Sequence, residues 1–379
     1  MKIGILTYYG DLNCGTNLQA YATLLNVRKV FPNDDVEIIP FHGFRPPNVR
    51  PGLYRMTLKS LYWDIHKMKE YKRFISCSLN VTNDRIIKNV DEALSFIKGR
   101  NYDRIYIGAD TLLELDRLPK GYDGLSAYWL RPEIKADKYL LAASAKNVEF
   151  AKLTENQKQQ IIACISDYKA MYVRDNNTYQ LISSIANDNR LKIICDPTFT
   201  LDIDYSNVEQ YISRHKLDLS NAICLYTLRG EKWETEFANN ARKAGYKVYS
   251  FRNASWADHV LLGMNPFEQL GIYRYFKCFI THRFHDTVFC LMNSTPVISY
   301  PFSSAHLNEN AQGKISSLLD TFQLTGLCYE PDKANISGNA MFKKACEVMQ
   351  IFPELVPSIK NTILQIRNEY IQSLVSTAS

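Results

Sequence analysis

The segment 278–300 constrains the fold of this chain more than any other stretch. Residues 278–281 are typical of the end of a short buried strand, and a polar turn follows at once. The apolar run 288–292 then suits a helix, and 296–300 suits a second buried strand. Strand, polar turn, helix and strand form the repeating unit of a doubly wound sheet, so this segment predicts an α/β fold.

The same alternation runs through most of the 379 residues, a length that suits two domains. We expect a first domain over 1–200, a second over 201–350, and a terminal helix within 351–379 that returns to the first domain. Both domains are predicted to be Rossmann-like and to face each other across a cleft. The predicted strands outside 278–300 are 2–7, 36–41, 103–108, 138–143, 170–173, 191–195, 222–227 and 247–251.

Three further segments complete this outline. Residues 196–220 are predicted to connect the domains, and the chain is predicted to end in two helices, 341–349 and 357–374. Residues 45–75 form an insertion with eight basic and two acidic side chains and interleaved aromatic residues. This insertion either faces anionic lipid headgroups, or packs its aromatic residues on the domain and leaves its lysines solvated. The composition favours the second interpretation slightly.

Composition narrows the class of protein. With 46% hydrophobic and 22% charged residues the chain is of ordinary globular type, and no run approaches the roughly 18 apolar residues of a membrane span. The formal charge of +6 is modest for this length and fits an anionic small molecule or a membrane surface as well as it fits nucleic acid. No nucleic-acid partner is predicted. Nine cysteines without a Cys-x-x-Cys pair indicate free thiols in a reducing compartment. We therefore expect a cytoplasmic protein, with peripheral contact at the inner face of the membrane as an option.

Polar side chains follow several predicted strands. Ligands of doubly wound sheets bind beyond the carboxyl ends of the strands, so we expect these side chains to line a site. The loop 8–17 lacks the Gly-x-Gly-x-x-Gly motif of dinucleotide-binding proteins. The candidates in the first domain are Asn13, Asn17, Asp110, Ser144, Lys146 and Arg174, and those in the second are His282, Arg283, His285, Asp286 and Thr287.

The polar turn of the second domain suits an anion. A guanidinium and two imidazoles lie at a predicted helix N-terminus, where backbone N–H groups and the helix dipole favour negative charge. His282 and His285 have a spacing compatible with a shared metal, but no third ligand accompanies them, so no metal is predicted. Structural roles stay open: Arg283 as the ion-pair partner of Asp286 or Asp258, and His282 as a packing residue.

These residues together make the sequence similar to the polysaccharide pyruvyl transferase family. Each motif is weak alone, and the resemblance rests on their order and spacing. Members often have Gly-Ser-Asp where this chain has Ala109, and glycine where it has Lys146 or Asp286. The motifs are Gly4–Gly10 with Asn13, Gly15, Asn17, Leu18, Gln19, Tyr21 and Ala22; Ile107–Asp110; Ala142–Ser144; Tyr172–Asp175; Asp196–Thr198; and Arg283–Thr287.

The resemblance implies a fold like that of the two-domain B-type glycosyltransferases. It also implies transfer of a pyruvyl group from phosphoenolpyruvate to hydroxyls of an exopolysaccharide, a cell-envelope polysaccharide or its precursor, with formation of a ketal. The family's Arg-x-His motif corresponds to Arg283 and His285, and its Val-Arg-Asp-like turn corresponds to Arg174. The resemblance therefore implies that these three residues are catalytic. The acceptor would be a saccharide, lipid-linked or free, and no cofactor is expected besides phosphoenolpyruvate as donor substrate.

The chemistry agrees with these residue types. Phosphoenolpyruvate carries a carboxylate and a phosphate, and planar guanidinium groups bind such oxygens bidentately. We expect Arg174 and Arg283 to hold one anionic group each, and His285 to move a proton near neutral pH. Asp110 is expected to position sugar hydroxyls, although turn formation is its alternative role. The other substrate-binding residues expected are His282, Asp286, Thr287, Ser144, Lys146, Asn13 and Asn17.

Two other functions stay open at this point. A glycosyltransferase that uses a nucleotide sugar would share the fold, but the second half shows no clear Glu-x7-Glu motif. A non-catalytic relative that binds an anionic glycan is the other alternative, supported by Ala109 and Asp286 in their motifs.

Overall fold

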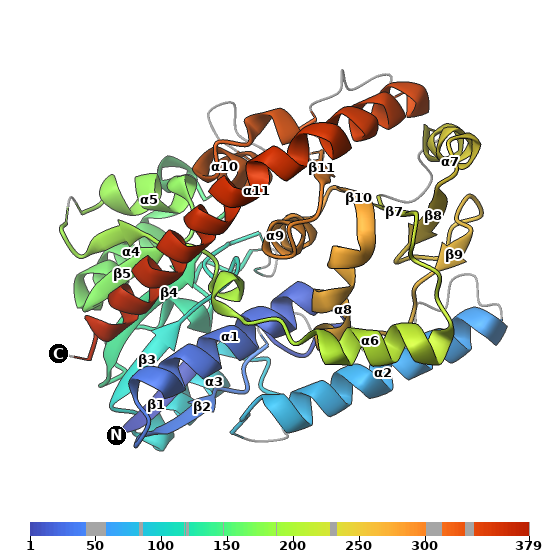
Figure 1. The fold of residues 1–379 in the computed structure, drawn as a ribbon. Coiled ribbons are helices and arrows are strands. Elements are labelled where there is room, and N and C mark those ends of the chain that lie inside the picture. The colour runs from blue at the N-terminus through green and yellow to red at the C-terminus, as the bar shows by residue number, and fades with distance from the viewer. Residues whose placement is uncertain are drawn as a thin grey trace. The chain divides into compact units, whose positions relative to one another are not determined.

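The fold is drawn in Figure 1, a computed structural model whose described residues fall into two compact units. Unit 1 comprises Met1–Arg50, Tyr71–Leu201 and Ile366–Ser379, and unit 2 comprises Pro51–Glu70 and Asp202–Gln365. The side chains of residues 58–64 are not described. The structure describes residues 1–42, 58–82, 86–116, 118, 121–146, 148–186, 188–227, 233–300, 313–329 and 337–378.

Unit 1 is built on a six-stranded parallel sheet with the order β2-β1-β3-β4-β5-β6. Its inner strands are continuous apolar runs because helices cover both faces of a doubly wound sheet. Strand β4, for example, is buried from its second residue to its last. The strands are β1 (Lys2–Leu6), β2 (Asp35–Ile38), β3 (Arg104–Ile107), β4 (Asp137–Ala143), β5 (Ala170–Val173) and β6 (Leu191–Ile193).

The helices of unit 1 begin at polar capping residues. Thr154 forms a capping box with Gln157, which accepts from the Thr154 backbone N–H at 3.2 Å. Asn89 and Asp175 accept backbone N–H groups at the starts of the helices that follow them. The helices are α1 (Cys14–Val30), α3 (Val90–Arg100), α4 (Glu155–Asp167) and α5 (Asn176–Ser183), with short 3-10 turns at Ala127–Trp129, Phe150–Lys152 and Pro197–Thr200.

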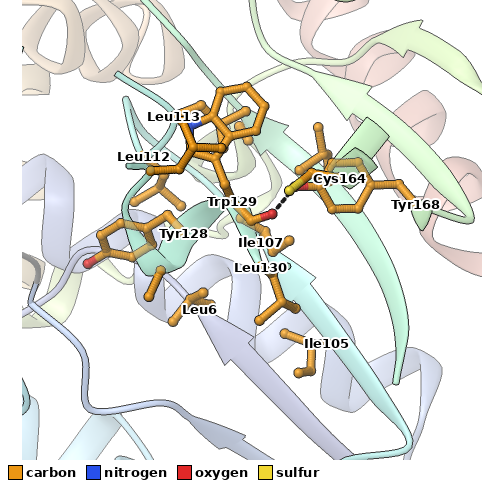
Figure 2. Close-up of a cluster of buried hydrophobic side chains, with 14 of the residues drawn as sticks. Leu6, Ile105, Ile107, Leu112, Leu113, Tyr128, Trp129, Leu130, Cys164 and Tyr168 are labelled. Atoms are coloured by element: carbon orange, nitrogen blue, oxygen red, sulfur yellow. Dashed lines mark hydrogen bonds between the residues drawn. The ribbon is translucent and has the colours of Figure 1, made fainter. Parts of the chain in front are cut away.

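A large hydrophobic core packs against the unit 1 sheet (Figure 2). Trp129 and Tyr168 are completely buried in it, and the Tyr168 hydroxyl donates to the Trp129 backbone oxygen at 2.6 Å. The bond satisfies a polar group that would otherwise be costly inside an apolar core. This core holds strands β3 and β4 in place, and therefore the loops at their carboxyl ends.

Unit 2 has its own five-stranded parallel sheet, with the order β11-β10-β7-β8-β9. Strand β10 lies near the centre, and Cys278, Phe279 and Ile280 within it are fully buried. The elements are β7 (Ala222–Tyr226), β8 (Lys247–Ser250), β9 (His259–Val260), β10 (Phe276–Thr281), β11 (Val297–Ser299), α6 (Tyr205–His215), α7 (Trp233–Lys243), α8 (Pro266–Ile272), α9 (Phe284–Met292), α10 (Lys314–Thr321) and 3-10 turns at Tyr273–Tyr275 and Thr325–Leu327.

Two helices contain the boundaries between the units: α2 (Leu58–Ser78) and α11 (Gly338–Val375). The last turns of α11 belong to unit 1, where the Thr377 and Ser376 hydroxyls bond the Tyr106 and Tyr172 hydroxyls at 2.6 and 2.7 Å. Arg367 donates there to the backbone oxygens that follow β6. Among the described helices, including these two, none combines the length and the apolar character needed to span a bilayer.

The observed elements differ from the expected ones in three places. The two expected terminal helices are one, α11, with Pro353 and Pro357 inside it. Phe352 and Ile359 on either side are buried, so packing compensates for the N–H donors that the prolines lack. Residues 196–220 contain helix α6 instead of a plain connection. The insertion contains helix α2, and its residues 43–57 lie outside the described part of the chain.

Candidate functional site

The carboxyl end of β10 carries the polar turn of unit 2. Buried β10 delivers Thr281 to the edge of the sheet, and its hydroxyl accepts from the Arg283 backbone N–H at 3.0 Å. Arg283 is the N-cap residue of α9, with an extended backbone (φ −104°, ψ 133°). The turn thus places the Arg283 side chain beside the first N–H groups of α9, a position that favours anions.

Arg283 is held by Tyr226, the last residue of the neighbouring strand β7. Its Nη1 donates to the Tyr226 hydroxyl at 2.5 Å, and its guanidinium carbon lies 4.7 Å from the centroid of that ring. Cation–π contact and hydrogen bond together fix the orientation of the guanidinium. The ion pair considered from the sequence does not account for this position, because Asp258 pairs with Arg242 at 2.7 Å.

Asp286 is buried and hydrogen-bonded within unit 2, and its substrate-binding role stays a prediction. It is 3% exposed, its Oδ1 accepts from the Tyr273 hydroxyl at 2.7 Å, and its Oδ2 accepts from the Thr281 hydroxyl at 2.9 Å. Thr287 is also buried, and its hydroxyl bonds the Arg283 backbone oxygen and the Ser299 hydroxyl at 3.1 and 2.7 Å. Both residues fasten α9 to the sheet and position the turn.

The two histidines of the turn have different surroundings. Burial lowers the pKa of His282, and the positive charges of Arg283 and Arg252 act in the same direction. His282 is therefore neutral at pH 7, with its ring 6.0 Å from that of Tyr300. His285 lies half-buried in the first turn of α9. In the described ranges no three His, Cys, Asp or Glu side chains are grouped to hold a metal ion, and the need for no metal stays a prediction.

A second arginine of unit 2 was missed from the sequence. Arg252 follows β8 and donates to Glu234 at 2.5 Å and to the Thr227 backbone oxygen at 3.1 Å. Glu234 is 2% exposed and also accepts from the Trp256 indole at 2.7 Å. The strand-end rule applied to the predicted strand 247–251 would have found Arg252. Its contacts hold the carboxyl end of β7, where Tyr226 and Thr227 lie.

Asp110 marks the carboxyl end of β3 in unit 1. Its backbone is left-handed (φ 83°), and its Oδ1 accepts from the Thr111 N–H at 2.8 Å. The Thr16 hydroxyl, from the first turn of α1, donates to Oδ2 at 3.5 Å. The side chain of Asp110 is 19% exposed. Its carboxylate is thus held by turn contacts and still reaches solvent, as an acceptor-binding group requires.

Arg174 lies among carboxylates of unit 1, and its role in holding a donor anion stays a prediction. Its side chain is 5% exposed, with Nη1 3.0 Å from Asp196 Oδ2 and Nη2 3.7 Å from Asp110 Oδ1. Burial alone would lower the pKa of Arg174, but the carboxylates of Asp196 and Asp110, with that of Asp175, outweigh burial and raise it. The guanidinium therefore stays charged and holds these carboxylates together.

The remaining unit 1 candidates are mostly structural. Asn17 is fully buried, and its side chain bonds the Gly10 N–H at 3.0 Å and the Asp11 backbone oxygen at 2.6 Å. Asn13 caps α1, and buried Ser144 accepts from the Lys146 N–H at 3.1 Å. These bonds shape the loops at the strand ends, and contact of the three residues with substrate stays a prediction.

Lys146 is the exception among them. Its side chain is 34% exposed, and its Nζ lies 2.8 Å from Asp116 and 3.3 Å from Glu114. Burial opposes its charge, but these two carboxylates raise its pKa. Lys146 therefore joins Asp110 at the part of unit 1 that a ligand can reach.

Comparison with known proteins gives the family. A family model described as polysaccharide pyruvyl transferase matches residues 13–304, which include the strand ends of both units. The chain belongs to this family. No curated protein sequence matches it. Pyruvyl transferase family membership was implied by the sequence motifs and is confirmed by this match.

Solved structures show the fold. UDP-GlcNAc 2-epimerase from Neisseria meningitidis, bound to UDP-GlcNAc, has a TM-score of 0.56 and 7% identity, covering 99% of this chain and 100% of its own. UDP-GlcNAc 2-epimerase from Methanocaldococcus jannaschii has a TM-score of 0.53 and 10% identity, covering 93% and 92%. These likenesses confirm an α/β fold with parallel sheets of the B-type glycosyltransferase class.

Proposed function

We propose that this family member transfers a pyruvyl group from phosphoenolpyruvate to hydroxyls of a saccharide and forms a ketal. The observation that carries the proposal is Arg283 at the carboxyl end of β10. Tyr226 holds its guanidinium, and the N-terminus of α9 lies beside it. Cation and helix N-terminus together suit a phosphate or carboxylate.

His285 is proposed to move protons in this reaction. The methylene carbon of phosphoenolpyruvate gains a proton, and a sugar hydroxyl bonds the adjacent carbon. A second hydroxyl of the sugar then bonds the same carbon as its bond to the phosphate oxygen breaks. One hydroxyl proton ends on the methyl group and the other leaves with phosphate. A half-buried imidazole in the first turn of α9 suits such transfers near neutral pH.

The acceptor is assigned to unit 1, through Asp110. An ionised carboxylate accepts hydrogen bonds from sugar hydroxyls, and this one is partly exposed and fixed by its turn. Arg174 acts indirectly, by holding Asp110 and Asp196. The burial of Asp286 also removes a reason to expect a non-catalytic relative, because its charge is engaged by two hydroxyls.

The direct test is a panel of saccharides incubated with phosphoenolpyruvate and analysed by mass spectrometry. We expect a pyruvyl adduct on at least one acceptor, with phosphate released only when that acceptor is present. Thermal-shift titration with phosphoenolpyruvate and UDP-GlcNAc separates the alternatives, because a ligand stabilises the protein that binds it. Stabilisation by UDP-GlcNAc alone, with no adduct, would favour a nucleotide-sugar enzyme instead.

We also propose peripheral contact of α2 with anionic membrane. Lys69, Lys72 and Arg73 are exposed on this helix, and Ile65 is 54% exposed, while Tyr71 is buried. The spacing of 65, 69, 72 and 73 places the exposed side chains on one helix face. The face is therefore basic with an apolar member, as interfacial helices are.

Replacement of Lys69 and Lys72 by glutamine should weaken binding to phosphatidylserine vesicles roughly 30-fold, at about 1 kcal/mol per basic residue. Cosedimentation with vesicles with and without phosphatidylserine measures this. Lys152→Gln with Lys169→Gln is the matched control, because these exposed lysines do not belong to α2. Equal loss of binding in both double variants, or none in either, would rule out this face.

A further inference from the structure

Carboxylates outnumber cations at the strand ends of unit 1. Arg174 is surrounded by Asp110, Asp175 and Asp196, the carboxylates that raise its pKa. Lys146 lies between two more. We call this set the unit 1 carboxylate network. Its members are Asp110, Glu114, Asp116, Asp175, Asp196, Lys146 and Arg174.

Because these charged side chains are buried, their electrostatic effect extends further than that of exposed charges. The side chains of Asp196, Glu114 and Arg174 are 1%, 3% and 5% exposed. Salt screens buried charges much less than exposed ones. Five carboxylates against two cations therefore give this end of the unit 1 sheet a negative potential, although the whole chain is formally positive at +6.

Two buried atoms of the network also have no hydrogen-bond partner in the described part of the chain. They are Gln19 Oε1 and Asp175 Oδ2, on residues that are 1% and 8% exposed. The Gln19 amide lies within the network because its nitrogen donates to Asp196. Asp175 uses its other oxygen for the N–H and hydroxyl of Thr178, both at 2.8 Å. Native proteins rarely leave such acceptors unbonded, so both are available to accept from hydroxyl or amine donors of a ligand or from water.

We propose that the unit 1 carboxylate network selects the acceptor by charge, with Asp110 as the specificity-determining residue. Neutral sugars and amino sugars offer donors to carboxylates, whereas a uronate or phosphorylated sugar brings a like charge to them. The inference rests on the proposed function, since it names the class of its acceptor. Asp110 and Asp116 are the most exposed carboxylates of the network, at 19% and 63%, so they are the ones that a sugar would contact.

The proposed selection by charge can be tested by measuring the binding of matched sugars in the absence of phosphoenolpyruvate. The probes are the methyl glycosides of glucose, galactose and mannose, each beside its uronate, with glucosamine as the cationic member. Ligand-observed NMR on the full chain measures each dissociation constant. We expect at least one neutral or amino sugar to bind at least about 10-fold more tightly than its uronate. Uronates that bind as well as their neutral partners, or no binding by any probe, would overturn the proposal.

Asp110→Asn and Asp116→Asn extend the test. Asparagine tolerates the left-handed backbone at position 110 and keeps an acceptor oxygen, so the fold is retained. Each variant should reduce the neutral-to-uronate ratio several-fold, whereas a merely structural role would weaken both sugars equally and leave the ratio unchanged. Asp137→Asn, an exposed aspartate at the start of β4, is the control and should also leave it unchanged.

Phosphoenolpyruvate titration of the same variants keeps the two proposals distinguishable. An unchanged donor affinity with a changed sugar ratio supports charge selection in unit 1. Sugar selection without any response to phosphoenolpyruvate would leave the network as a sugar site and refute the donor assignment alone.

Discussion

Replacement of Arg283 by glutamine is expected to lower kcat/KM for phosphoenolpyruvate by on the order of 10²–10³-fold, while the protein remains folded. Glutamine loses the charge and the planar fork that bind phosphate or carboxylate bidentately. The stability cost is small, because the side chain is half-buried and its cation–π contact and bond to Tyr226 contribute only about 1–2 kcal/mol together. Steady-state kinetics and thermal unfolding of the same preparation measure both effects.

Two variants sharpen this test. Arg214→Gln removes a largely exposed arginine of unit 2, 3.8 Å from Glu268, and should leave kcat/KM unchanged. His285→Ala should lower kcat while phosphoenolpyruvate still stabilises the protein, because the guanidinium remains. If Arg283→Gln and Arg214→Gln have the same activity, the end of β10 is not the donor site.

Gly108→Ala is expected to prevent folding of unit 1 or to destabilise it by more than about 4 kcal/mol. A Cβ at this position would lie 1.7 Å from the Leu141 backbone oxygen and 2.6 Å from its carbonyl carbon, and φ is +155°. Backbone atoms of β4 cannot move aside without disturbing the sheet. We expect aggregated protein, or a melting temperature lower by more than about 8 °C.

Gly99→Ala is the matched control. Position 99 lies within α3, and no atom lies within 4 Å of the added Cβ. Alanine favours the helix by roughly 0.5–1 kcal/mol, so this variant should be as stable as the parent or slightly more stable. Normal stability of Gly108→Ala in circular dichroism melts would contradict the close approach of β3 and β4.

The fold could be predicted where burial is continuous in sequence. The strand 170–173 was predicted with the bounds that the structure shows, because an apolar run is a local signal. Helix α11 was divided wrongly, because proline is a local signal for a helix end. Its continuation through Pro353 depends on buried neighbours such as Phe352, which is tertiary information.

For the candidate site, the sequence predicted only where the residues lie in the fold. The strand-end rule identified Asp110, Arg174 and Arg283, because topology alone brings strand ends to one edge of a sheet. It could not show what each side chain contacts. Arg174 meets Asp196, 22 residues away, and Asp286 meets Tyr273 through the packing of α9. These pairings arise from sheet order and side-chain direction, which no local pattern encodes.

The residues that follow α11 complete contacts with strands of unit 1 that come much earlier in the chain. The hydroxyls of Tyr106 and Tyr172 find their partners, Thr377 and Ser376, 271 and 204 residues further along the chain. A ribosome therefore releases the six strands of unit 1 long before the segment that covers them. Loss of the segment that begins at Ile366 would therefore damage the unit that is translated first.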